Sequence, residues 1–208
     1  MDKSLYRSDQ ELGKYNKFQQ AFIKMQIGSE VRKKSEYCGI LSRLAIREIK
    51  KERDKLRKLP VKGDEDKKVI VYLIRQLKRT EEIDVLNSVY GNSFIQLSVQ
   101  DSDENIKRNL KDGFRENYSS QVNEKKDKAF IESIGKKNFS TEDVETQVYE
   151  LIKKDFSEVD PNYKEWGQEL SDCFDKGHYF MHCGVSQPVV AEQIERFFKL
   201  LCSSLDLI

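Results

Sequence analysis

Long apolar runs are missing from this chain of 208 residues. No stretch approaches the ~20 consecutive apolar residues that a membrane-spanning helix needs. The first residues, Met-Asp-Lys-Ser-Leu-Tyr-Arg, also lack the apolar core of a secretory signal peptide. We therefore expect a cytoplasmic protein that makes no contact with a membrane.

Paired cysteines and an excess of charge of one sign are missing as well. The four cysteines form no C-x-x-C pair, so we expect reduced thiols. The 37 basic and 36 acidic side chains leave a formal net charge of only +1. This balance gives no bulk attraction to nucleic acid or to an anionic membrane, although it leaves local charged patches open.

What the chain does contain is a strongly ionic surface around a modest core, since 35% of its residues are charged and 38% hydrophobic. The length suits one α/β domain with a helical appendage. Helical spacing of apolar positions covers residues 9–59, and Pro60 and Gly63 end it. We expect a helical segment over residues 1–62 and an α/β core over residues 63–208.

Residues 69–99 are the most informative stretch. Residues 69–74, Val-Ile-Val-Tyr-Leu-Ile, are typical of a strand buried on both faces. Residues 81–90 have the spacing of a short amphipathic helix that Gly91 closes, and residues 94–99 form a second apolar run. The pattern predicts a βαβ unit with two parallel strands, and ligands bind at the carboxyl ends of such strands.

The rest of the chain is mostly helical. Helices are expected to start near Ser102 and Ser140, residues 178–182 form a third strand, and Pro188 opens a final amphipathic helix. The predicted fold class is α/β, with a partial parallel sheet flanked by many helices. Three strands are few for such a sheet, so part of it is expected to lie outside this chain.

Three cations follow the first predicted strand: Arg75, Lys78 and Arg79. One interpretation is phosphate binding, in which arginine forms bidentate hydrogen bonds and lysine supplies a point charge. The other is a solvated basic loop. The sequence alone leaves both open.

His178, His182 and Cys183, with Cys173 nearby, suggest a zinc site as one interpretation. On a strand the two histidines would lie roughly 13 Å apart at ~3.3 Å per residue, too far for one ion. On a helix their spacing would suit a metal, but Tyr179 favours a strand. We expect no metal in this chain.

Several segments, in this order, resemble one family. They are residues 44–49 (LAIREI), 71–83 (VYLIRQLKRTEEI), 89–94 (VYGNSF), 154–158 (KDFSE), 167–168 (GQ), 172–174 (DCF), 178–181 (HYFM) and 195–201 (ERFFKLL). Together they look like the P-loop-kinase-like amino-terminal domain of the bacterial anti-phage dCTP deaminases. The resemblance covers most of residues 15–205 and implies a partial P-loop nucleotide-kinase-like sheet.

The resemblance also implies roles for further residues. Lys107, Arg108 and Arg115 resemble the lid of small nucleotide kinases, where arginine neutralises phosphate, although a charged helix face is the favoured interpretation. A second set could hold Mg²⁺ or a ribose: Asp155, Gln168 and Asp172.

Two family elements are missing from the sequence. No G-x-x-x-x-G-K-[ST] phosphate loop is present, and neither is the H-x-E or P-C-x-x-C element of the deaminase zinc site. The chain is therefore expected to be an internal slice of such a protein. Zinc would belong to the missing deaminase domain, and Mg²⁺ would come only with a nucleotide.

Two functions follow as hypotheses. The first is a regulatory, nucleotide-sensing module of an anti-phage cytidine deaminase, with deoxynucleotides and the deaminase domain as partners. The second is a stand-alone protein–protein interaction module that keeps a degenerate P-loop fold and pairs through its terminal apolar helices, with homo-oligomers as one outcome. An active nucleoside monophosphate kinase is disfavoured, because nothing replaces the ring of N–H donors in the phosphate loop.

Overall fold

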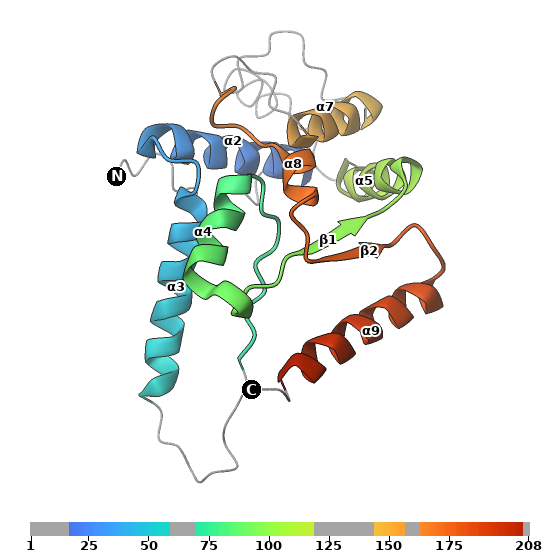
Figure 1. Ribbon diagram of the computed structural model, residues 1–208. Helices are drawn as coiled ribbons and strands as arrows, with labels where there is room; N and C mark the ends of the chain where they lie inside the picture. The colour runs from blue at the N-terminus through green and yellow to red at the C-terminus, as the bar shows by residue number, and fades with distance from the viewer. Residues whose placement is uncertain (1–16, 59–69, 119–143, 157–162, 206–208) are drawn as a thin grey trace.

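The computed structural model describes residues 17–58, 70–118, 144–156 and 163–205, without the side chains of residues 115–118 and 202–205. Within these ranges the chain is mostly helical with a small parallel sheet, which confirms the general α/β class (Figure 1). The elements, in order, are α2 (Lys17–Ser35), α3 (Ile40–Arg57), α4 (Thr80–Tyr90), the 3₁₀ turn η3 (Gly91–Ser93), β1 (Leu97–Gln100), α5 (Asp103–Tyr118), α7 (Val144–Phe156), α8 (Leu170–Phe174), β2 (Tyr179–His182) and α9 (Gln187–Leu205).

The sheet consists of β1 and β2, which run parallel. Their register pairs Leu97 with Tyr179 and Gln100 with His182. These two strands confirm the second and third predicted strands and their parallel direction. The connection between them passes through α5, α7 and α8, as parallel strands require a long crossover.

The first predicted strand, residues 69–74, is wrong for the residues that the structure describes. Residues 70–74 belong to no strand. Val71 and Leu73 are 78% and 93% exposed, where a strand buried on both faces was expected. Apolar β-forming side chains permit a strand but cannot supply its neighbour, and none of the described segments pairs with this one. The predicted βαβ unit therefore forms only its helix and its second strand.

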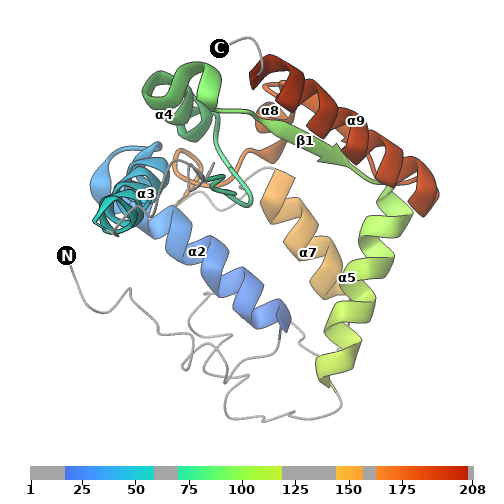
Figure 2. The ribbon, with the colours of Figure 1, turned by 90° about the horizontal axis from the view of Figure 1, so that it is seen from below.

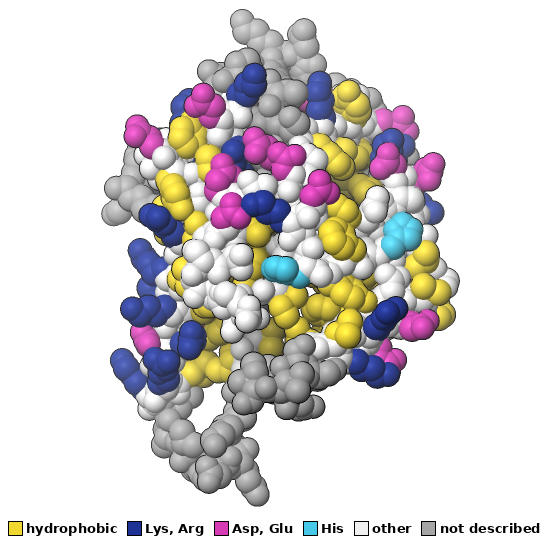
Figure 3. All heavy atoms as spheres, in the orientation of Figure 1, with side chains coloured by type: hydrophobic (Ala, Val, Ile, Leu, Met, Phe, Trp, Pro, Cys, Tyr) yellow, Lys and Arg dark blue, Asp and Glu magenta, His cyan; other side chains and the backbone are white. Residues whose placement is uncertain are grey.

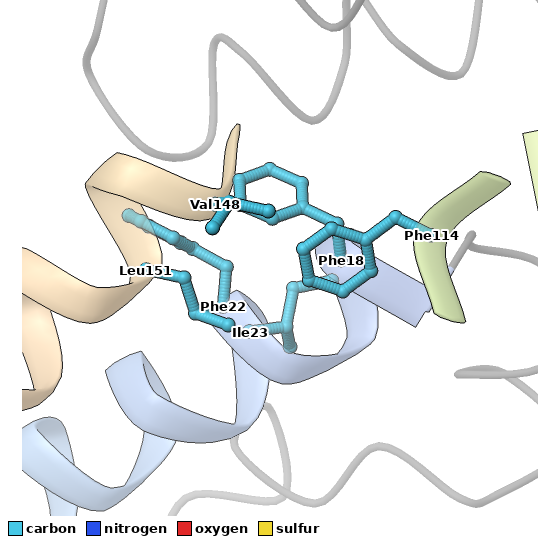
Figure 4. Packing of buried hydrophobic residues seen from close by; sticks show 6 residues of the cluster. All are labelled: Phe18, Phe22, Ile23, Phe114, Val148 and Leu151. Atoms are coloured by element: carbon cyan, nitrogen blue, oxygen red, sulfur yellow. The ribbon is translucent and has the colours of Figure 1, made fainter. Parts of the chain in front are cut away.

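The main hydrophobic core joins the start of the chain to its middle. Phe18 and Phe22 lie one turn apart on α2 and face Phe114 of α5 and Val148 and Leu151 of α7 (Figure 4). The rings of Phe18 and Phe114 meet edge to face at 5.5 Å. Figure 2 shows the three helices lying along one side of the molecule. The predicted helical segment therefore shares its core with the predicted α/β segment.

The last helix, α9, is held against β2 by polar and aromatic contacts. The amide of Gln193 accepts from the backbone N–H of His182 at 2.9 Å and donates to its carbonyl oxygen at 3.0 Å. The rings of Tyr179 and Phe197 lie 5.1 Å apart. This contact covers one side of the strand pair. Among the described helices, none is both long and apolar enough to cross a membrane.

Candidate binding site

The candidate site surrounds the amino-terminal end of α4, where the predicted cations lie. The backbone of Arg79 is extended (φ −143°) and precedes the first turn. Glu81 and Glu82 occupy that first turn, where the helix dipole favours negative charge. Just before it, Gln76 adopts a left-handed conformation (φ 66°), a backbone state that non-glycine residues rarely occupy. The chain thus turns sharply between the exposed apolar segment and this site.

A buried ion pair ties α2 to α4. The guanidinium of Arg32 donates to one carboxylate oxygen of Glu82 from Nε at 3.0 Å and from Nη2 at 2.7 Å. The two side chains are only 2% and 3% exposed. The other Glu82 oxygen accepts from the backbone N–H of Lys78 at 2.8 Å, and the Ser42 hydroxyl donates to the Glu82 carbonyl at 2.8 Å. One glutamate therefore holds α2, α3 and the entry to α4 together.

Arg79 and Lys78 are paired with carboxylates from other segments. Arg79 bonds Glu81 through Nε at 3.1 Å and Nη2 at 3.0 Å, and its Nη1 lies 3.1 Å from Glu169. The same Nη1 donates to the Gly167 carbonyl at 3.2 Å. The ammonium of Lys78 bonds Asp155 at the end of α7. The loop before α8 and the end of α7 thus converge on these two cations.

We call this group the buried charge cluster. Its members are the cations Arg32, Lys78 and Arg79 and the carboxylates Glu81, Glu82, Asp155 and Glu169. Four carboxylates outnumber three cations, so the cluster has no surplus positive charge for an anion. A phosphate would have to displace carboxylates that already satisfy these cations. Among the described residues, the cluster links four segments: α2, the start of α4, the end of α7 and the loop before α8.

The ion pairs change the titration of the groups in and beside the cluster. The hydrogen bonds from Arg79 lower the pKa of Glu81 to about 2. The thiol of Cys38 lies beside Glu81 and Arg79, and burial raises its pKa above the usual value. At neutral pH the Glu81 carboxylate is therefore ionised, and the Cys38 thiol is protonated.

The remaining predicted phosphate ligands lie apart from the cluster. Arg75 is exposed, and its side chain forms no hydrogen bond or ion pair with another described residue. Arg108 sits on α5 and donates to Asn105 at 2.6 Å, beside a shallow hollow of about 370 Å³. The side chain of Arg115 lies outside the described residues. Of the three cations that follow the first predicted strand, the structure therefore brings Lys78 and Arg79 into the cluster but leaves Arg75 outside it.

The residues predicted to hold Mg²⁺ or a ribose are also separated in the structure. Asp155 joins the cluster, whereas Asp172 is exposed on α8. Gln168 is 3% exposed in the loop that contacts Lys78 and Arg79, and its side-chain oxygen has no hydrogen-bond partner. A buried acceptor without a donor is rare and marks a place where a ligand or water donor fits.

Of the two histidines, His178 accepts a backbone hydrogen bond and His182 is exposed. Nδ1 of His178 accepts from the backbone N–H of Gln96 at 2.8 Å, and His182 extends from the end of β2. Burial raises the pKa of the nearby Cys173 thiol to about 12. Across the described residues, no group of three His, Cys, Asp or Glu side chains is arranged to hold a metal ion.

Sequence reasoning missed Arg32, Glu82 and Glu169, which complete the cluster. Glu81-Glu82 at a helix start was a visible signal for a capped amino terminus. Nothing local marks Arg32, which lies 50 positions before its partner.

Comparisons with known proteins give no family for the chain: no protein-family model, no curated protein and no solved structure matches it.

Proposed function

We propose that this chain is a protein-interaction module whose unfinished sheet pairs with a strand of another polypeptide, a second copy of the chain being the occupant. The observation that carries this proposal is the exposed apolar segment at residues 70–74. Val71 and Leu73 are β-forming side chains that folding would normally bury, and here they face solvent.

The strand pair adds a complementary feature. In the described part of the chain, β1 pairs with β2 alone and keeps one unpaired edge, whereas the Gln193 amide of α9 bonds the backbone of His182 on the outer edge of β2. Leu97 and Val99 of β1 and Phe180 of β2 are also exposed, and Figure 3 shows hydrophobic side chains gathered over this part of the surface. One chain thus offers both an unpaired strand-forming segment and an unpaired edge of β1, which favours self-association by strand addition.

Light scattering after size-exclusion chromatography tests this function. We expect the native chain to associate at micromolar concentration, and Leu73→Lys to shift it to a monomer. Leu56→Lys is the matched control, because Leu56 is an exposed leucine on α3, away from the strand edges. A native chain that stays monomeric at about 100 μM, well above the affinity of specific assemblies, contradicts the proposal.

A second function, a nucleotide-sensing module of an anti-phage cytidine deaminase, is favoured by the orphaned acceptor of Gln168. Cytosine presents an exocyclic amine donor, which uracil and thymine lack. The parallel strand pair with α4 before β1 supports the finer fold assignment, a partial P-loop nucleotide-kinase-like sheet. On this proposal the deaminase domain is the partner, zinc belongs to that domain, and Mg²⁺ enters with the nucleotide.

Calorimetric titration with dCTP and dTTP, with and without Mg²⁺, tests the second function. We expect dCTP to bind more tightly than dTTP, and Gln168→Leu to remove that preference while leaving the fold unchanged by circular dichroism. Equal binding of the two nucleotides, or no heat and no thermal shift at about 1 mM nucleotide, rejects it.

A further inference from the structure

The net positive charge of this nearly neutral chain gathers on two helices: α2, with five Arg or Lys and one Glu, and α3. α3 carries seven Arg or Lys and three Asp or Glu residues, a net charge of +4. The whole chain has +1, so all other residues together carry −3. Figure 3 shows the Lys and Arg side chains gathered along the lower part of this helix. Such segregation creates a local attraction for anions that the net charge hides.

Two of these cations are not engaged by the fold. Lys51 and Lys55 form ion pairs at 2.7 and 2.6 Å with glutamates one turn earlier. Lys50 and Arg53, by contrast, are exposed and form no ion pair with a described residue. They lie one turn apart on the side of α3 that faces α4. Their charge is therefore available to a ligand.

Lys50 and Arg53 line a hollow of about 260 Å³ between α3 and α4. Arg57 extends the same wall and lies 4.0 Å from Asp54, the single carboxylate among the lining residues. The opposite wall is apolar and aromatic, formed by Val89 and Tyr90 at the end of α4. From Lys50 to Arg57 the helix rises about 10 Å, which matches about three phosphates of a stacked nucleic-acid strand.

The chemistry of the hollow discriminates among polyanions. An anionic membrane needs the apolar side of an amphipathic helix to enter the lipid, but α3 packs against α2 and α4. An acidic peptide would use the cations but gain nothing specific from the Tyr90 ring. A single nucleic-acid strand uses both, since its phosphates meet cations while a base stacks on an aromatic ring.

We propose that the hollow between α3 and α4 binds single-stranded nucleic acid, with Lys50, Arg53 and Arg57 contacting successive phosphates and Tyr90 stacking on a base. This site lies apart from the buried charge cluster and does not depend on strand addition. It gives the interaction module a second, electrostatically driven ligand.

Fluorescence anisotropy with a labelled oligothymidylate of about 20 nucleotides measures the site directly. The test variant is Lys50→Gln/Arg53→Gln, and the matched control is Lys51→Gln/Lys55→Gln. Each removes two positive charges from the same helix, but only the first pair lines the hollow and lacks intramolecular partners. All four side chains are exposed, so both variants should fold, which circular dichroism verifies.

We expect the test variant to bind at least tenfold more weakly at about 50 mM salt. The slope of log K against log salt should fall by about 1.4, at ~0.7 per phosphate contact in a single strand. The control should change affinity less than twofold. Tyr90→Leu should weaken oligonucleotide binding but not the binding of polyglutamate.

Three results overturn the proposal. No binding at about 50 mM salt means that the basic face is only solvated. Equal losses in the two double variants mean that a diffuse field acts without a site. Polyglutamate that competes as well as the oligonucleotide at equal charge identifies an acidic peptide as the ligand.

Discussion

Replacing Arg32 with methionine should be among the most destabilising single changes in the described part of the chain. The substitution leaves the Glu82 carboxylate, 3% exposed, without its cation. Removing one partner of a buried ion pair costs about 3–5 kcal/mol, because the remaining charge stays buried and uncompensated. The free energy of unfolding of a whole domain is only about 5–15 kcal/mol. This loss of free energy of unfolding should therefore leave the protein close to unfolding at about 37 °C.

Urea unfolding followed by circular dichroism measures this loss. With a slope of about 2 kcal/mol/M, the Arg32→Met midpoint should fall by about 2 M. Arg32→Met/Glu82→Gln should recover much of it, because the uncharged amide keeps an acceptor for the Lys78 N–H without a buried charge. Lys51→Met, which breaks an exposed pair with Glu48, should cost less than about 1 kcal/mol. Equal costs for Arg32→Met and Lys51→Met, or a double variant no better than the single one, would refute the reasoning.

Three further predictions concern titration and packing. The pKa of Glu81 is about 2 in the fold against 4.5 unperturbed, so its pairing with Arg79 stabilises the protein above about pH 5 and is lost as the pH falls through 2. Measured as urea midpoints, Glu81→Gln should cost about 1 kcal/mol at pH 7, after allowance for a side chain 40% exposed, and far less at pH 2, where the carboxyl is half protonated. Burial raises the pKa of the Cys173 thiol to about 12. We therefore expect this thiol to resist a disulfide reagent at pH 8 in the native protein and to react once the protein unfolds. Prompt reaction in the native state would contradict its burial. Phe18→Ala should lower the free energy of unfolding, measured by thermal unfolding, by about 3 kcal/mol or more, because Phe18 is buried in the core. Phe198→Ala, with a side chain 55% exposed, should lower it by less than about 1 kcal/mol. Similar losses for the two variants would contradict the observed core.

The elements that the sequence predicted well are those with local signals. The helix expected over residues 81–90 is observed as Thr80–Tyr90, because acidic residues in the first turn and Gly91 at the end mark it within a few positions. The strand expected over residues 178–182 is observed as Tyr179–His182.

The elements that the sequence predicted poorly depend on distant partners. Residues 70–74 have the composition of a strand, but pairing requires a neighbour that no local pattern reveals. The candidate site shows the same limit. The charges of Lys78 and Arg79 were visible, but not the carboxylates that occupy them, since Asp155 and Glu169 lie far along the chain. A cation is a phosphate ligand only when the fold leaves it unpaired, as it does for Lys50.

The spacing of the two strands affects how the protein is made. β1 ends at Gln100, but β2 begins only at Tyr179, near the carboxyl terminus. At 5–20 residues per second, a ribosome takes roughly 4–16 s to synthesise the intervening crossover. During that time the nascent chain can join α3 to α4 through Ser42 and Glu82, but its first strand waits without a partner. On the proposed strand addition, two growing chains on one messenger would display these strands to each other, and assembly would begin on the polysome before either polypeptide is released.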